Sequence, residues 1–188
     1  MNDIQAGVLW YIHFGITCTS WGPAARRNGG SRTLERPEGD GSRDKEILGN
    51  LQADRVAMIC CMLVTFGYHY SIENPHSSYL WKYPSIRRLY EHHNSVFATL
   101  DQCAFGLQLP GAPKNTFCRK STSILSNLTQ IATLSKRCPG FSTCHQHEEA
   151  WGSRTVNGRS VKLCRAAGTY PRNLCQEWAR VAMQSVSL

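Results

Sequence analysis

The stretch "VAMICCMLVTFGYHYSIENP", residues 56–75, joins two different hydrophobic patterns. Up to Phe66 the apolar residues recur at three- and four-residue spacing, which is typical of a helix packed on a core. Gly67 follows, and a glycine just past a helix commonly takes the left-handed conformation that ends it. The next residues, "YHYSIE", are rich in aromatic and β-branched side chains and predict a strand. The stretch therefore predicts helix, turn and strand, the repeating unit of an α/β fold.

The same patterns extend the prediction along the chain. Strands are predicted at residues 7–16, 68–73 and 95–103, and two short strands joined by a basic turn within residues 115–127. Helices are predicted at residues 45–66, 85–94, 129–138 and 170–185. This alternation favours a mostly parallel sheet with helices on both of its faces.

Residues 22–44, "GPAARRNGGSRTLERPEGDGSRD", interrupt that alternation. They hold many Gly, Pro and Arg residues and show no apolar periodicity. Loops of this length and composition are typically mobile or functional. We therefore predict a long loop that is mobile unless a ligand orders it.

The composition fits one globular domain and excludes several classes of protein. The 188 residues are 41% hydrophobic and 18% charged, which suffices for a single core. No apolar run reaches the ~20 residues of a membrane span, and the first residues lack the features of a signal peptide. Nine cysteines without a repeated spacing indicate a reducing compartment, so we expect an intracellular protein, nuclear or cytoplasmic. The net charge of +8 favours an anionic partner, nucleic acid first.

Two chemistry-bearing residues follow the first two predicted strands. Cys18 lies just past the first strand, and Glu73 with Asn74 lies at the end of the second. In open α/β sheets ligands bind at the carboxyl ends of the strands, so a thiol and a carboxylate are expected to share one site. Each residue alone also has an ordinary structural interpretation, as a buried cysteine and as a helix cap or surface ion pair.

The order of these motifs resembles the DNA cytosine-C5 methyltransferases. In that family a strand ends in Pro-Cys, a helix follows, and the next strand ends in Glu-Asn-Val. The counterparts here are "GITCTSWG", residues 15–22, and "FGYHYSIENP", residues 66–75. Residues 104–107 would match the family's next turn, and its Arg-rich strands would begin near Arg119. The chain is more similar still to methylase-like segments of retroelement polyproteins in algae and dinoflagellates.

The resemblance implies a mechanism for the residues it matches. Cys18 would add to carbon-6 of an extruded cytosine and so activate carbon-5. Glu73, protonated near neutral pH, would stabilise the charge that develops at ring nitrogen-3, and Asn74 would orient the acid or the exocyclic amine. The DNA phosphates would be held by Arg26, Arg27, Arg119 and Lys120.

The resemblance covers about residues 8–130 and is incomplete. Thr17 and Thr19 flank Cys18 where the family has Pro and Gln, and Pro75 replaces Val. The family's Phe-x-Gly-x-Gly motif for S-adenosylmethionine has no counterpart. We therefore expect a partial Rossmann-like methyltransferase sheet, the catalytic half of such an enzyme, with a second chain or an upstream segment supplying the cofactor site.

A third group of residues suggests a metal. The segment "CPGFSTCHQH" offers Cys138, Cys144, His145 and His147, and thiolate with imidazole suits tetrahedral zinc. Cys164 and Cys175 are further candidates to complete the site. The expected organisation is therefore a single domain, with a methyltransferase-like half at residues 1–135, an irregular Cys/His-rich segment at 136–168 and a closing helix at 169–188.

Two alternatives to an active cytosine-C5 enzyme stay open. The first is a basic nucleic-acid-binding module that derives from such an enzyme but lacks catalysis, which the net charge and the missing cofactor motif favour. The second is an amino-group methyltransferase, because that class places Asn-Pro-Pro and an aromatic residue after a strand. Asn74 and Pro75 match that motif, but His76 stands where its second Pro is expected.

Overall fold

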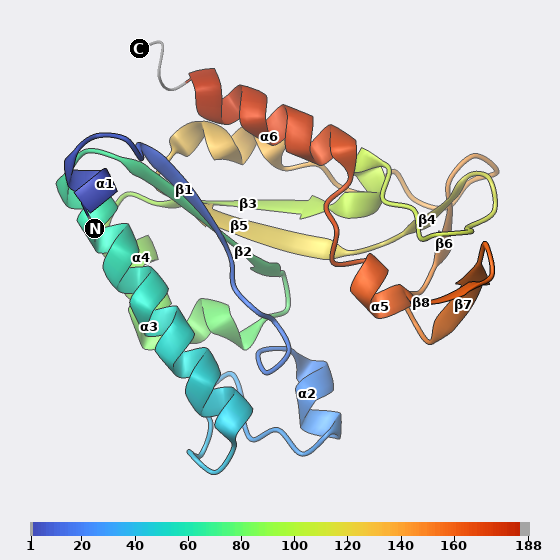
Figure 1. Ribbon diagram of the computed structural model, residues 1–188, viewed down its shortest axis with the longest axis horizontal. Coiled ribbons are helices and arrows are strands. Elements are labelled where there is room, and N and C mark those ends of the chain that lie inside the picture. The colour runs from blue at the N-terminus through green and yellow to red at the C-terminus, as the bar shows by residue number, and fades with distance from the viewer. Residues whose placement is uncertain (1, 185–188) are drawn as a thin grey trace. The chain divides into compact units, whose positions relative to one another are not determined.

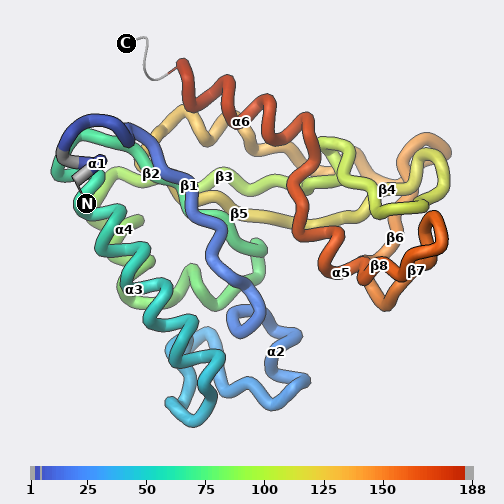
Figure 2. The backbone as a smooth tube through the Cα atoms, viewed as in Figure 1, coloured from blue at the N-terminus to red at the C-terminus, as the bar shows by residue number. Residues whose placement is uncertain are grey.

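The computed structural model describes residues 2–184, which are shown in Figure 1 as a ribbon and in Figure 2 as a backbone tube. The chain divides into two compact units. Unit 1 comprises residues 1–98 and 123–132, and unit 2 comprises residues 99–122 and 133–188. The observed fold is mixed α/β with a partly parallel sheet and several helices.

Unit 1 contains most of the predicted strand–helix alternation. Its elements are α1 (Asn2–Gln5), β1 (Tyr11–Gly15), α2 (Pro23–Arg27), α3 (Asp44–Thr65), β2 (His69–Pro75), the 3₁₀ helix η1 (Tyr79–Lys82) and α4 (Pro84–His92). Three elements cross from one unit to the other: β3 (Val96–Asp101), β5 (Ser121–Ser126) and the 3₁₀ helix η3 (Thr129–Leu134). The main sheet has the strand order β1-β2-β5-β3.

The connection from β1 through α3 to β2 confirms the first prediction. β1 and β2 are adjacent and parallel (Figure 1), with Tyr11 opposite His69 and Gly15 opposite Glu73. Gly67 ends α3 with a φ of 74°, and its N–H donates to the carbonyl of Val64. A side chain at that φ would be strained, which explains why a glycine stands between the helix and the strand.

The core of unit 1 lies between α3, α4 and the sheet. The sheet contributes Tyr70 and Ile72, α3 contributes Cys60 and Leu63, and all four are fully buried. Helix α3 is also long and apolar enough to cross a bilayer, judged by length and composition alone. One third (33%) of its apolar window is buried inside the protein, as expected of a helix that packs on a core along one face.

The loop predicted for residues 22–44 is built around a buried cation. Arg32 is only 1% exposed and lies over the Trp21 ring, 3.5 Å from its centroid. Its guanidinium donates to the Pro37 carbonyl, to the Asn50 side chain at 2.8 Å and to the Glu46 carbonyl at 2.7 Å. Residues 22–44 are mostly loop, as predicted, with the short helix α2 near their start. Composition cannot reveal that one arginine organises the segment through contacts with α3.

Unit 2 is formed by shorter elements. They are the 3₁₀ helix η2 (Gln102–Phe105), β4 (Thr116–Cys118), β6 (Gln146–Glu148), β7 (Ser153–Val156), β8 (Arg159–Lys162), α5 (Leu163–Ala166) and α6 (Arg172–Gln184). β4 pairs with β6 in parallel, and β7 pairs with β8 as an antiparallel hairpin. The predicted pair of strands in residues 115–127 exists, but its members join different sheets.

Residues 136–168 were expected to be irregular; this holds for residues 136–145 and is wrong for the part that forms β6, β7, β8 and α5. The hairpin turns at Asn157 and Gly158, whose φ values are 50° and 73°, so both central residues are left-handed. Such a two-residue turn matches the twist of the paired strands on either side. Part of the backbone of this polar segment is thus hydrogen-bonded within strands.

Candidate functional site

The strand-end residues of unit 1 are held by the parallel pair β1 and β2. Glu73 lies on β2 opposite Gly15, the last residue of β1. Asn74 is fully buried, and its side-chain amide donates to the carbonyl of Ile16 at 2.7 Å. This bond fixes the chain as it leaves β1, two residues before Cys18. The structure thus brings the segment of Cys18 to the same edge of the sheet as Glu73 and Asn74.

The three side chains differ in their exposure. Cys18 is exposed, whereas Glu73 is only 6% exposed and Asn74 is fully buried. The turn after Cys18 is held by two backbone bonds, from Trp21 to the Cys18 carbonyl at 3.0 Å and from Tyr79 to the Trp21 carbonyl at 2.8 Å. The thiol is therefore accessible on a fixed turn, and the carboxyl group lies in the protein interior.

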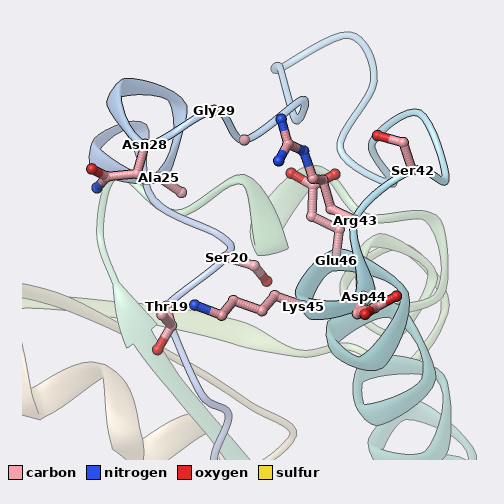
Figure 3. Close-up of a pocket in the computed structure, with 11 residues that line it drawn as sticks. Thr19, Ser20, Ala25, Asn28, Gly29, Ser42, Arg43, Asp44, Lys45 and Glu46 are labelled. Atoms are coloured by element: carbon pink, nitrogen blue, oxygen red, sulfur yellow. The ribbon is translucent and has the colours of Figure 1, made fainter.

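The cavity next to this turn is lined by other residues. It has a volume of about 560 Å³ and is lined by Thr19, Ser20, parts of α2 and its following turn, and residues 42–46 at the start of α3. Figure 3 shows the Lys45 side chain extending toward Thr19 across this space. Neither Cys18 nor Glu73 lines it. Arg26 and Arg27 are exposed in the last turn of α2.

Unit 2 contains a compact group of metal-ligating side chains. Cys103, Cys138, His145 and His147 each offer one ligand atom, and all four atoms lie within 4.8 Å of one another. The Cys138 sulfur is 3.6 Å from Nε2 of His145 and 3.3 Å from Nε2 of His147. The two Nε2 atoms are 3.1 Å apart. These four residues can hold a metal ion.

The group differs in one member from the predicted set. Cys103 stands where Cys144 was expected, and Cys144 is exposed with its sulfur 3.3 Å from the Ser142 hydroxyl. Adjacent residues rarely bind one ion together. Of the neighbours Cys144 and His145, only His145 belongs to the ligand group. Cys164 and Cys175 are exposed and lie outside the group.

The four ligands come from different segments of unit 2. Cys103 lies in η2, directly after β3, and Cys138 lies in the irregular segment after η3. Reciprocal backbone bonds between Ser142 and His145, 3.0 and 3.2 Å long, close the turn before the first histidine. His147 lies on β6 opposite Phe117 of β4, whose ring stacks on His145 with centroids 4.7 Å apart.

Neighbouring polar groups orient the Cys138 sulfur and its backbone. The N–H of Gly140 donates to that sulfur at 3.3 Å, and the N–H of Cys138 donates to the carboxylate of Asp101 at 3.0 Å. Burial, and then the hydrogen bond and charge of Cys138, raise the pKa of the Cys103 thiol to about 12. A bound metal cation would favour the ionised form of this thiol.

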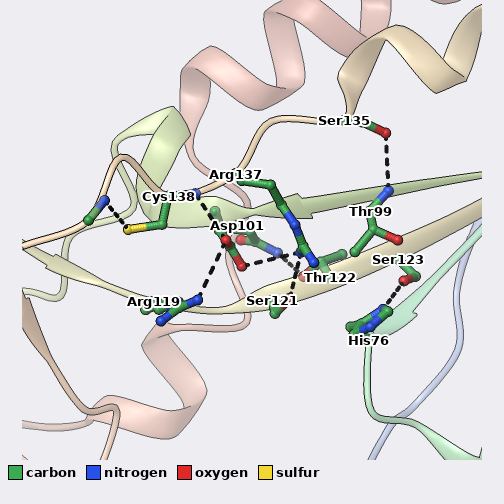
Figure 4. A network of polar contacts seen from close by, with 12 residues as sticks. His76, Thr99, Asp101, Arg119, Ser121, Thr122, Ser123, Ser135, Arg137 and Cys138 are labelled. Atoms are coloured by element: carbon green, nitrogen blue, oxygen red, sulfur yellow. Dashed lines mark hydrogen bonds and ion pairs between the residues drawn. The ribbon is translucent and has the colours of Figure 1, made fainter.

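Asp101 also connects this group to basic side chains (Figure 4). It is 2% exposed, and its carboxylate lies 4.0 Å from a guanidinium nitrogen of Arg119 and 3.8 Å from one of Arg137. Both arginine side chains stay about 60% exposed, at 61% and 60%. Lys120 lies beside the Tyr170 ring, 5.7 Å from its centroid. The predicted pair Arg119 and Lys120 thus belongs to unit 2 and follows β4.

Comparison with protein-family models, with curated proteins and with solved structures finds no match. The function must therefore be inferred from the chemistry of the chain's own residues.

Proposed function

We propose that unit 2 is a zinc-stabilised module that binds nucleic acid. The distribution of charge is the observation that carries the proposal. Unit 2 has 11 Lys and Arg residues against 4 Asp and Glu, a net charge of +7, whereas unit 1 has 10 against 9, a net charge of +1. A concentrated positive charge is the electrostatic signature of polyanion binding. The excess charge of the chain therefore points to unit 2 as the binding element.

The spacing of the ligand atoms supports zinc as the metal. In a regular tetrahedron with zinc–nitrogen bonds of about 2.0–2.1 Å and zinc–sulfur bonds of about 2.3 Å, the nitrogen–nitrogen edge is about 3.3 Å and the nitrogen–sulfur edge about 3.6 Å. The corresponding distances here are 3.1 Å between the histidines and 3.3 and 3.6 Å from Cys138. Cys103 supplies a fourth ligand atom. Four protein ligands are typical of structural zinc rather than of a catalytic ion with an open position.

Zinc would also support the basic residues. Asp101 accepts from the backbone of the ligand Cys138 and lies between Arg119 and Arg137. The next residue, Gln102, donates its N–H to the carbonyl of Lys120 at 2.9 Å. Residues 101–103 therefore connect the metal ligands Cys103 and Cys138 to the backbone of Lys120. Loss of the metal should disorder the phosphate-binding side chains as well as the ligands.

Fluorescence anisotropy with a labelled 20-nucleotide DNA, measured at several salt concentrations, tests the proposal. We expect binding that weakens steeply with salt, because released counterions give a slope of roughly −0.7 to −0.9 per phosphate contact. The variant Arg119→Gln/Lys120→Gln should weaken binding and make the slope shallower. The control Arg88→Gln removes an exposed arginine of α4 in unit 1 and should leave both unchanged. An equal loss of DNA affinity in the double variant and in the control, or no DNA binding at low salt, would overturn the proposal.

Unit 1 supports a second candidate function, the cytosine-C5 chemistry suggested by the resemblance. The parallel pairing of β1 and β2, with Gly15 opposite Glu73, is the observation that favours it. The thiolate of Cys18 would add to carbon-6 of cytosine, and the electron pair would pass to carbon-5. Glu73 would donate a proton or hydrogen bond at nitrogen-3. The residues present do not fit S-adenosylmethionine, because no Phe-x-Gly-x-Gly motif occurs in the chain.

Hydrogen exchange at carbon-5 tests this second candidate without a methyl donor. Reversible addition of the thiol makes carbon-5 nucleophilic, so it takes a proton from water and loses its original hydrogen when the thiol leaves. DNA tritiated at carbon-5 of cytosine should release tritium with the wild-type chain and not with Cys18→Ala. Cys61→Ala removes another exposed cysteine of unit 1 and is the matched control. Release that is independent of Cys18 would exclude this thiol as the nucleophile.

A further inference from the structure

Two aromatic side chains of unit 2 are almost fully exposed. Trp151 is 85% exposed and Phe141 is 78% exposed, more than any other large hydrophobic residue in the described part of the chain. A single exposed hydrophobic residue is ordinary. These two need an explanation because both flank the metal-ligating group and its basic neighbours.

Trp151 follows the end of β6, directly after residues that line a cavity together with Arg119 and Lys120. β4 and β6 run in parallel, with Cys118 opposite Glu148, so the residues that follow each strand leave the pair in the same direction. On one side these are Arg119 and Lys120, and on the other residues 149–151. A cavity of about 550 Å³ lies between them, with Arg119, Lys120, His147 and Ala150 in its lining. Trp151 directly follows Ala150.

Two carboxylates also line this cavity, and one of them is already paired. Arg154 donates to the side chain of Glu148 in a part-buried ion pair, which neutralises that carboxylate. Glu149 and Arg119 are both exposed, so water screens both charges. With Arg154 counted, the three cations around the cavity outnumber its two carboxylates by one, which suits a phosphate group.

Phe141 is held by the metal-ligating loop. It stands between Gly140, whose N–H donates to the sulfur of Cys138, and Ser142, whose backbone pairs with His145. Ligands thus lie on both sides of it in the sequence. A fixed loop presents an aromatic ring at a smaller entropic cost than a mobile one.

We infer that unit 2 binds single-stranded nucleic acid, with bases stacked on Trp151 and Phe141 and phosphates held by Arg119 and Lys120. Every base has a face that can stack on an aromatic ring, and a positively charged groove follows the backbone. In a duplex the bases are stacked on one another and cannot reach these rings. The inference rests on the proposed nucleic-acid binding and names the form of nucleic acid that is bound.

The test compares a labelled 12-nucleotide single strand with a 12-base-pair duplex at one salt concentration. Wild-type protein should bind the single strand more tightly. Trp151→Ala should weaken that binding about 5- to 150-fold, the change that corresponds to about 1–3 kcal/mol per stacked base. Trp151→Phe should retain most of the affinity, and Phe141→Ala should weaken it within the same range. Duplex binding should stay unchanged in all three variants.

Two controls separate the possible failures. Met183→Ala removes another exposed apolar side chain of unit 2, 60% exposed on α6, and should not affect binding. Unchanged melting temperatures should show that the aromatic variants are folded. Equal affinity for duplex and single strand, with no effect of Trp151→Ala, would overturn this inference and leave the proposed function intact. Failure to bind either form would overturn the proposed function itself.

Discussion

Replacement of Cys103 and of Cys144 by serine distinguishes the metal centre seen in the structure from the one expected from sequence spacing. Cys103 is 2% exposed and belongs to the four-ligand group, whereas Cys144 is exposed and lies outside it. A serine hydroxyl is a poor zinc ligand at neutral pH, and its volume is close to that of a thiol. Cys103→Ser should therefore lose zinc with little change in packing, and Cys144→Ser should keep it.

The effect of zinc on the melting temperature can be estimated from the free zinc concentration and the size of unit 2. Free zinc held at 100 times its dissociation constant stabilises the folded state by about 2.7 kcal/mol. Unit 2 has about 80 residues, and in a domain of that size 1 kcal/mol shifts the melting temperature by about 4–8 °C. Zinc should therefore raise the melting temperature of unit 2 by about 10–20 °C in the wild-type chain and in Cys144→Ser. The shift should be absent in Cys103→Ser.

Zinc content by elemental analysis, combined with thermal melting at fixed free zinc, measures both effects. Protein purified in reducing buffer without chelators should carry close to one zinc ion per chain. Loss of zinc in Cys144→Ser with retention in Cys103→Ser would show that the ligand assignment is reversed. A wild-type chain that carries no zinc and melts independently of zinc would refute the centre altogether.

Three further predictions follow from single contacts. Arg32→Met should destabilise unit 1 by about 2–4 kcal/mol in urea unfolding, because it leaves buried acceptors on Pro37 and Glu46 without their donor; a loss below about 1 kcal/mol would contradict this. Asp101→Asn should weaken zinc binding about 10- to 100-fold in competition with a chelating dye, and unchanged affinity would show that Asp101 does not support the site. Gly158→Ala should cost about 1–2 kcal/mol, because φ is 73° there; the control Gly22→Ala, at a φ of −96° with open space around it, should be nearly neutral.

Hydrophobic periodicity predicted the larger elements of unit 1. The structure confirms the helix predicted up to Phe66 and the strand predicted after Gly67. The bounds of α3 and β2 agree with these predictions to within two residues at each end. The pairing of β1 with β2 also agrees with the expected parallel arrangement. Such elements are predictable because a buried face imposes a regular pattern on the sequence.

Other features depend on contacts that a local pattern does not contain. The hairpin β7–β8 did have a usable signal, since Asn157-Gly158 between two polar strands is the preferred two-residue turn. No local sequence pattern marked the roles of Arg32 and Cys103. Arg32 is buried by α3, and Cys103 lies 35 positions before Cys138. Only the folded chain shows that either residue belongs to its cluster.

The distance along the chain between Cys103 and the other ligands has a consequence for the order of folding. Cys138, His145 and His147 lie within ten residues, so they can meet by closing short loops, which takes about 10–100 ns. Cys103 must instead close a loop of about 35 residues, at an entropic cost of about 3 kcal/mol. During synthesis Cys103 leaves the ribosome before the other three ligands do. Zinc can therefore be captured by the late, local ligands and then draw in the early one, so the last bond to the metal closes the longest loop within the ligand group.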